Sequence, residues 1–173
     1  WEAVLSNTAV VLEAARKARI LVIYTVNIHQ PEHRSLSGAH LRRLIRGGYK
    51  PGEDPIPYLI GTEVTEIPSA IAPKPGERIL GKYRANAFKG TELEVLLSPG
   101  NIKTIVFAGR STDWCVEATL WEALARDYYT VVLEDCVHSG REEGHTAALR
   151  QMKLISEVVT SGDVINMWEN GRR

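Results

Sequence analysis

Short, continuously apolar segments alternate along this chain with amphipathic segments of helical length, and this alternation limits the possible folds more than any other feature. Apolar segments without polar alternation are typical of strands buried on both faces of a parallel sheet. The expected strands are 20–26, 78–83, 104–109, 130–135 and 157–161. The expected helices are 3–18, 91–98, 113–127, 142–154 and a short one near 162–169. The sequence therefore predicts an α/β protein with a doubly wound, mostly parallel sheet between two layers of helices.

The length of the chain predicts one domain over residues 1–173, because 173 residues with 44 % hydrophobic content bury roughly 70 % of the unfolded surface in one core. Segment 27–77 differs from the rest, since it is polar and carries several glycines and prolines. Connections of that length are usually functional or locally folded.

Charge and cysteine content exclude several classes of partner. The 21 basic and 21 acidic residues are interspersed, which favours neither nucleic acid nor an anionic membrane as a partner. The longest apolar run, ILVIYTV, is far shorter than the roughly 20 residues that span a bilayer, and the chain does not open on a charged-then-apolar leader. Two cysteines are too few for a disulfide framework and indicate a reducing compartment. We therefore expect a soluble, cytoplasmic protein.

One of the two cysteines stands where a strand turns into a helix. Cys115 follows the expected strand 104–109, and open α/β sheets bind ligands at the carboxyl ends of their strands. It falls in the first turn of the next helix, with Ser111 or Thr112 as an expected cap, where backbone N–H groups favour a thiolate and can hold an oxyanion. Local features alone leave open that Cys115 packs as a small apolar residue.

A lysine ends the preceding strand. Lys82 closes segment 78–83, and parallel strands bring their carboxyl ends to the same edge of the sheet. Lys82 could therefore meet Cys115, although spacing alone favours a solvated lysine at the strand end.

Two segments together resemble a known family. KYRANAFKGTELEVLL, followed by NIKTIVFAGRSTDWCVEATLWEALARDYYTVVLEDC, is similar to the isochorismatase-like cysteine hydrolases, a superfamily with nicotinamidase, isochorismatase, N-carbamoylsarcosine amidase, ureidoacrylate amidase and biuret hydrolase. The resemblance runs from about residue 3 to 165, and its most specific parts are the lysine segment and the T-x-x-C-V-x-x-T pattern at Thr112, Cys115, Val116 and Thr119.

The resemblance implies an Asp–Lys–Cys triad with Cys115 as nucleophile and Lys82 as cation. It implies hydrolysis of an amide through a thioester, with the aspartate as proton carrier. The implied oxyanion donors are the backbone N–H groups of Ser111 and Cys115, and a cis peptide bond is expected between Arg110 and Ser111. A homo-oligomer, dimer or tetramer, is also expected, and no cofactor.

The aspartate of this triad has no match in the chain. The resemblance places it at the end of a first strand that precedes the opening helix, and the implied strand order 3-2-1-4-5-6 puts that strand at the centre of the sheet. Without it, backbone groups on two strand edges would lack partners, at about 1–3 kcal/mol each when buried. We therefore expect the sequence to be an N-terminally incomplete part of a longer protein, which an intact mass of only 19.2 kDa would contradict.

A metal site is not expected. Segment 25–35 aligns with the nicotinamidase segment whose aspartate and histidines bind a divalent metal, and His29 and His33 match its histidines. However, Asn27 stands at the aspartate position and Pro57 at a further histidine position. Whether His29 or His33 contacts substrate or metal stays open.

Several other residues are candidates for the substrate site. Trp114 and Phe88 are pocket-wall or ordinary core aromatics, and Asn86 either binds substrate or holds its loop. Arg110, which follows a strand at the same edge, could clamp a substrate carboxylate, with surface charge as the alternative. Cys136 is expected to be packed and inert.

The sequence is best explained by a hydrolase that cleaves a carbon–nitrogen bond of a small amide or ureido compound. One alternative is vinyl-ether hydrolysis of the isochorismatase type. Another is a catalytically silent binding or assembly protein, which the absent aspartate permits. A nucleotide-binding domain is disfavoured because GRSTDWC has one glycine and lacks both G-x-G-x-x-G and Walker spacing.

Overall fold

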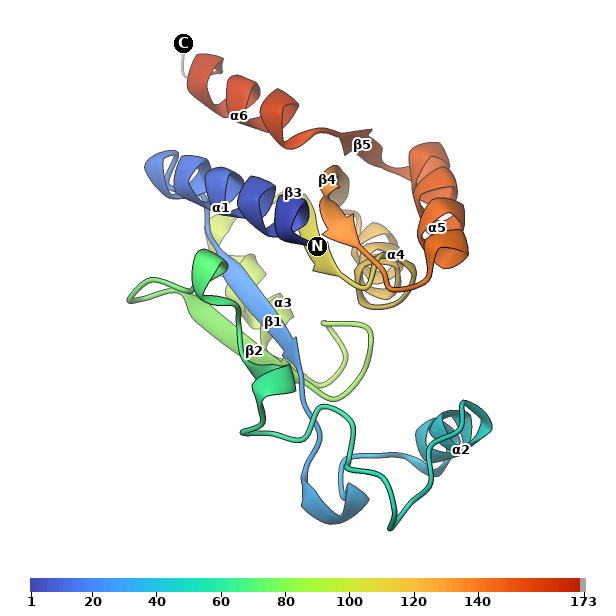
Figure 1. The fold of residues 1–173 in the computed structure, drawn as a ribbon. Coiled ribbons are helices and arrows are strands. Elements are labelled where there is room, and N and C mark those ends of the chain that lie inside the picture. Colours follow the sequence, from blue (N-terminus) through green and yellow to red (C-terminus); the bar gives the residue numbers. More distant parts are fainter. Residues whose placement is uncertain (172–173) are drawn as a thin grey trace.

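The computed structural model describes residues 1–171 and contains parallel strands and helices in alternation, which confirms the predicted α/β class (Figure 1). The strands are β1 Ile23–Asn27, β2 Arg78–Lys82, β3 Thr104–Arg110, β4 Tyr129–His138 and β5 Glu157–Val159. The α-helices are α1 Glu2–Lys17, α2 Gly38–Arg46, α3 Leu93–Leu97, α4 Glu117–Ala125, α5 Glu142–Ile155 and α6 Ser161–Asn170. All five expected strands and all five expected helices are present, with boundaries shifted by a few residues.

The strands form two separate parallel sheets. β1 pairs with β2, and β3, β4 and β5 form the second sheet in that order. Within residues 1–171, β1 and β3 each have one strand neighbour. These are the two strands that would flank the expected central strand, and the full order 3-2-1-4-5-6 stays a prediction.

Helices cover both faces of the three-stranded sheet, which gives it the expected three layers (Figure 1). On one face, Val11 of α1 and Val164 of α6 pack against Leu133 and Cys136 of β4. The larger cluster lies on the other face and joins β4 to α3, α4 and α5; its most buried members are Leu120, Ala123, Val132 and Met152, each 0 % exposed. The central strand β4 thus fits the prediction of burial on both faces.

The same prediction is wrong for the two-stranded sheet. Ile79 in β2 is 53 % exposed, and Thr25 in β1 is also exposed. The physical reason is that side chains alternate between the two faces of a strand, and in β2 only the face that carries Leu80 and Lys82 is buried.

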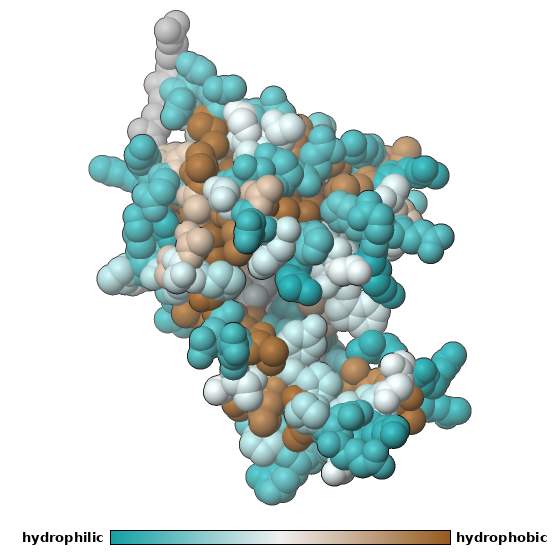
Figure 2. Space-filling view, in the orientation of Figure 1, coloured by the Kyte–Doolittle hydropathy of each residue, from teal (hydrophilic) through white to brown (hydrophobic). Residues whose placement is uncertain are grey.

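The long connection after β1 is locally folded, as its length predicts. It contains α2 and three short 3-10 turns, at Pro31–His33, Glu63–Thr65 and Ser69–Ile71. The Ser37 hydroxyl caps α2 by accepting a hydrogen bond from the backbone N–H of His40. In Figure 2 the part of the surface that carries α2 is mostly hydrophilic, with some hydrophobic side chains among the hydrophilic ones.

Within residues 1–171, none of the helices combines the length and the apolar character that crossing a membrane requires.

Candidate active site

Cys115 lies in a tight π-helical turn, Thr112–Val116, that joins β3 to α4. The backbone N–H of Val116 donates to the carbonyl of Ser111, five residues back, at 3.1 Å. The expected helix 113–127 is therefore divided into this turn and α4, and π-helical turns often occur at functional sites. Ser111 occupies the N-cap position of the turn, as the sequence predicts, but its side chain forms no capping hydrogen bond.

The backbone before this turn has two special features. The peptide bond between Arg110 and Ser111 is cis, which confirms the expectation from the resemblance. Gly109 has a φ of +114°, a conformation that side-chain-bearing residues rarely adopt, so glycine is required there. The register between β3 and β4 also shifts between Phe107 and Gly109.

Lys82, at the end of β2, reaches Cys115. Its side chain is buried, with the whole residue only 2 % exposed, and its Nζ lies 3.1 Å from the Sγ of Cys115. Nζ also donates to Asn27 Oδ1 at 2.7 Å and to the carbonyl of Arg84 at 3.1 Å. These three contacts use the three donors of an ammonium group. The predicted approach of the lysine to the cysteine is confirmed, and a solvated lysine is excluded.

The parallel pairing of β1 and β2 explains the position of Asn27. Asn27 and Lys82 are direct register partners at the ends of the two strands. The family resemblance places Asn27 at the position of a metal-binding aspartate. In the structure its amide oxygen contacts the lysine instead.

The two threonines of the T-x-x-C-V-x-x-T pattern form hydrogen bonds that connect the turn to neighbouring segments. Thr119 donates to the carbonyl of Cys115 at 2.7 Å and accepts from the backbone N–H of Ala87 at 3.1 Å. Thr112 is fully buried, and its hydroxyl lies 2.8 Å from Nδ1 of His145 on α5. The pattern therefore holds Cys115 between α5 and the segment that follows Lys82.

Asp113 secures the same turn from its other side. Its carboxylate accepts from the Ser139 hydroxyl at 2.7 Å and from Arg141 at 2.5 Å. Burial alone would raise the pKa of Asp113, but these hydrogen bonds outweigh burial and the pKa is lowered. Asp113 therefore stays ionised and holds the turn against the start of α5.

Two of the predicted substrate residues contact other parts of the protein. Asn86 donates from its amide to Glu122 at 3.1 Å, and its oxygen accepts from the backbone N–H of Phe88 at 2.8 Å. Phe88 is 7 % exposed, stacks on Tyr128 and lies in the larger core cluster. These contacts favour the structural alternative for both residues, and their contact with substrate stays a prediction.

Trp114 and Arg110 are both exposed, and each forms a cation–π contact. The guanidinium of Arg43, from α2, lies 4.6 Å from the ring centroid of Trp114, which is 40 % exposed. Arg110 lies over the ring of Trp1 at 5.3 Å. Sequence reasoning missed Arg43, because it lies in the long connection, where no periodicity reveals the path of the chain.

The two histidines compared with metal ligands have separate surroundings. His29 is 1 % exposed, and its Nδ1 lies 3.2 Å from the Ser35 hydroxyl. His33 lies 2.6 Å from the Tyr49 hydroxyl. No group of three or more His, Cys, Asp and Glu side chains suited to a metal occurs within residues 1–171.

The second cysteine differs from the first. Cys136 is 0 % exposed, whereas Cys115 is half-buried. Burial, together with the negative charge of Asp135, raises the pKa of Cys136 to about 11. Its thiol is therefore protonated at neutral pH.

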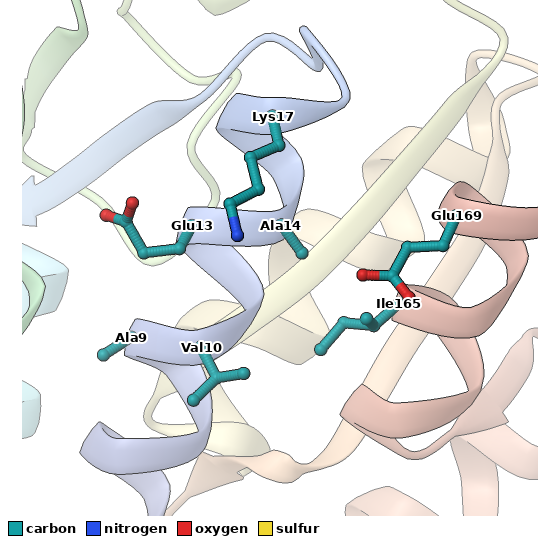
Figure 3. A pocket seen from close by; sticks show the side chains of 7 residues that line it. All are labelled: Ala9, Val10, Glu13, Ala14, Lys17, Ile165 and Glu169. Atoms are coloured by element: carbon teal, nitrogen blue, oxygen red, sulfur yellow. The ribbon is translucent and has the colours of Figure 1, made fainter.

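A surface pocket lies at a distance from this turn in the fold, between α1 and α6 (Figure 3). Its lining includes Val10 and Ala14 of α1 and Ile165 of α6. Neither Cys115 nor Lys82 lines it, so we place the candidate site on the contact between these two side chains.

The fold and the contact between Lys82 and Cys115 define a parallel α/β protein in which a lysine that ends β2 meets a cysteine that follows β3. The isochorismatase domain family matches residues 1–163, and the chain belongs to this family.

Relatives with named activities are amidohydrolases. A maleamate amidohydrolase of Pseudomonas putida is 30 % identical over 166 residues, which cover 94 % of this chain and 73 % of that protein. The ureidoacrylate amidohydrolase RutB of an Enterobacter species is 31 % identical, over 84 % of this chain and 66 % of its own length. The chain thus spans about two thirds to three quarters of these proteins.

Solved structures share the fold. An isochorismatase family protein from Burkholderia thailandensis has a TM-score of 0.81 at 28 % identity, covering 98 % of this chain and 84 % of that one. The N-carbamoylsarcosine amidase of Thermoplasma acidophilum has a TM-score of 0.73 at 24 % identity, over 92 % and 83 % of the two chains.

Proposed function

We propose that this protein hydrolyses a carbon–nitrogen bond of a small amide or ureido compound and that Cys115 is its nucleophile. The observation that carries the proposal is the 3.1 Å contact between Lys82 Nζ and Cys115 Sγ. Lys82 is 2 % exposed, so its charge acts on the sulfur with little screening by water. An ammonium group at this distance stabilises a thiolate, which is the nucleophilic form of cysteine.

The reaction would proceed through a thioester. The Cys115 thiolate attacks the carbonyl carbon, and the carbonyl electrons move to oxygen to give a tetrahedral oxyanion. By the family resemblance, the backbone N–H groups of Ser111 and Cys115 stabilise that oxyanion. Its collapse breaks the C–N bond, and the amine or ammonia leaves with a proton given by the proton carrier, which takes a proton back from water in the next step. Water then attacks the thioester, which releases the acid and restores the thiol.

The proton carrier of this reaction is a separate part of the proposal. Within residues 1–171, no carboxylate contacts Nζ of Lys82; its side-chain partners are Asn27 and Cys115. A neutral amide such as Asn27 does not take up a proton at ordinary pH. By the family resemblance, an aspartate remains the expected proton carrier.

Substitution of Cys115 tests the proposal. Ammonia release is measured with maleamate, ureidoacrylate, N-carbamoyl amino acids, biuret and nicotinamide. Cys115→Ala and Lys82→Met should each abolish turnover, while Cys136→Ala, which removes the other thiol, should keep it. Mass spectrometry of rapidly quenched wild-type protein should detect an acyl group on Cys115. Turnover that survives Cys115→Ala would overturn the nucleophile assignment.

A further inference from the structure

One side of α4 carries three residues that bind the segment after Lys82. Thr119, Glu122 and Arg126 follow one another at spacings of three and four positions, which places them along the same side of a helix. Cys115 lies one turn before Thr119, and the two are joined by a hydrogen bond. The helix that follows the candidate nucleophile therefore faces the segment that follows the lysine.

The hydroxyl of Thr119 connects the two segments that carry the reacting side chains. Its hydrogen is donated to the carbonyl of Cys115 at 2.7 Å, and its oxygen accepts from the backbone N–H of Ala87 at 3.1 Å. Thr119 is 8 % exposed and Ala87 is 2 % exposed, so water has little access to either hydrogen bond. Loss of the hydroxyl would leave the N–H of Ala87 buried without its acceptor.

Glu122 and Arg126 bind the residues on either side of Ala87. Oε2 of Glu122 accepts from the amide of Asn86 at 3.1 Å, while its Oε1 accepts from Arg126 at 2.9 Å. The guanidinium carbon of Arg126 lies 4.8 Å from the ring centroid of Phe88, whose backbone N–H donates to Asn86 Oδ1. Three consecutive residues of the segment are therefore each held by a residue of this side of the helix.

The same segment also holds the lysine. Nζ of Lys82 donates to the carbonyl of Arg84 at 3.1 Å, and Arg84 lies two residues before Asn86. The Sγ of Cys115 lies at the same distance from Nζ, 3.1 Å. A displacement of the segment by about 1 Å would break the hydrogen bond to Arg84 or draw Nζ away from the sulfur.

We propose that Thr119 and Glu122 are positioning residues, which act through the segment after Lys82 to hold the ammonium group at the sulfur of Cys115. Within residues 1–171, neither forms a hydrogen bond with Nζ or Sγ, so their effect on the chemistry passes through the lysine. The inference rests on the proposed function, because it concerns the thiolate that the lysine stabilises.

Alkylation of Cys115 by iodoacetamide, followed by peptide mapping at a fixed neutral pH, tests the inference without requiring turnover. Thr119→Val keeps the shape of the side chain but removes its hydroxyl, and it should slow alkylation about three- to tenfold. Thr119→Ser keeps the hydroxyl and should react within about twofold of the wild type. Glu122→Leu should slow alkylation about twofold or more, and Glu122→Gln, which keeps an acceptor for Asn86, should restore most of the rate.

The matched control is Thr130→Val. Thr130, in β4, is 4 % exposed, and its hydroxyl donates to that of Ser156 at 2.8 Å. This substitution removes a comparable buried hydrogen bond and should lower stability in urea to a similar extent, but it should leave the alkylation of Cys115 unchanged. If it slowed alkylation as much as Thr119→Val, a general loss of stability would be the cause and the inference would be overturned.

A double-mutant cycle separates the inference from the proposed function. In the Lys82→Met background, Thr119→Val should change the alkylation rate by less than about twofold, because the lysine through which it acts is absent. Equal slowing in both backgrounds, or wild-type alkylation in Thr119→Val, would overturn the inference alone. Unchanged alkylation in Lys82→Met would overturn the stabilised thiolate of the proposed function, and the inference with it. If the double variant does not fold, the comparison of Thr119→Val with Thr119→Ser and Thr130→Val still decides.

Discussion

The amide oxygen of Asn27 accepts a 2.7 Å hydrogen bond from the buried ammonium group of Lys82, and the two residues are direct partners in the pairing of β1 and β2. The strand register therefore places an uncharged acceptor beside the cation. Because an amide leaves the charge of Lys82 unneutralised, that charge remains available to the sulfur of Cys115, 3.1 Å away.

Removal of the Asn27 amide should therefore destabilise the protein. In Asn27→Leu, of similar size, one donor of the buried Lys82 ammonium loses its acceptor, which should lower the free energy of unfolding by about 1–3 kcal/mol. Urea denaturation measures this loss. Asn27→Asp keeps an acceptor and should keep the stability, but its negative charge should reduce kcat because it competes with the thiolate for Lys82. An Asn27→Leu protein as stable as the wild type would contradict the role of this hydrogen bond.

The two thiols should differ widely in their reaction with iodoacetamide. Cys136 is 0 % exposed and its pKa is raised to about 11, so only about 0.1 % of it is ionised at pH 8. Cys115 is half-buried and contacts Lys82, so it should be alkylated at least about 10-fold faster. Peptide mapping over time measures both rates. Lys82→Met should slow the reaction of Cys115 alone, and similar rates for the two thiols in wild-type protein would contradict the prediction.

The sequence predicts the elements that depend on local pattern. Apolar runs predict all five strands. Strand direction places Lys82 and Cys115 at the same edge of the fold, and the family resemblance adds their contact. The family resemblance adds the cis bond at Arg110–Ser111. The strands and the cis bond are signalled by residues within or next to them.

Features that depend on tertiary contacts are not predicted. The stacking of Arg43 on Trp114 joins two segments that are far apart in sequence, and no periodicity relates them. Phe88 and Asn86 flank the lysine segment and therefore suggest a pocket, but packing and a hydrogen bond to Glu122 use their side chains elsewhere. Proximity in sequence did not determine the direction in which these side chains point.

A close approach of α5 to the turn of Cys115 makes Gly144 sensitive to substitution. A Cβ at Gly144 would lie 2.1 Å from Oδ2 of Asp113, a distance that forces the carboxylate or the helix to move. Gly144→Ala should therefore lower the free energy of unfolding by about 1–3 kcal/mol and reduce kcat, because Asp113 belongs to the turn of the nucleophile. Thermal denaturation and the assay of ammonia release measure the two effects.

A glycine in the same part of another helix is the control for Gly144. Gly162 lies in the first turn of α6, and a Cβ there would lie 3.7 Å from the Thr160 hydroxyl, an ordinary contact. Gly162→Ala should be neutral or stabilising by up to about 1 kcal/mol, because alanine restricts the unfolded chain. If the two substitutions changed the free energy of unfolding equally, the close approach of Asp113 to α5 would not be the cause of the stability loss in Gly144→Ala.

The protonation of His29 should make stability depend on pH. Burial, with the nearby positive charges of His40, Arg84, Arg43 and Lys82, lowers the pKa of His29 to about 4 in the folded protein, from 6.5 for the ordinary group. Between these two values the unfolded chain holds the proton and the folded protein does not, so stability rises with pH. His29 therefore contributes fully above about pH 6.5, and up to about 3 kcal/mol is lost as the pH falls through 4.

Comparison with His29→Gln isolates this contribution from the other groups that titrate in the same range, including His40, whose pKa is also lowered. Urea denaturation of both proteins at pH 7, 6, 5 and 4 should show a steeper loss of stability in the wild type. The ring of His29, followed by NMR, should titrate with a midpoint near 4, well below an exposed histidine. Parallel stability curves, or a ring that titrates near 6.5, would contradict the effect of burial and positive charge on His29.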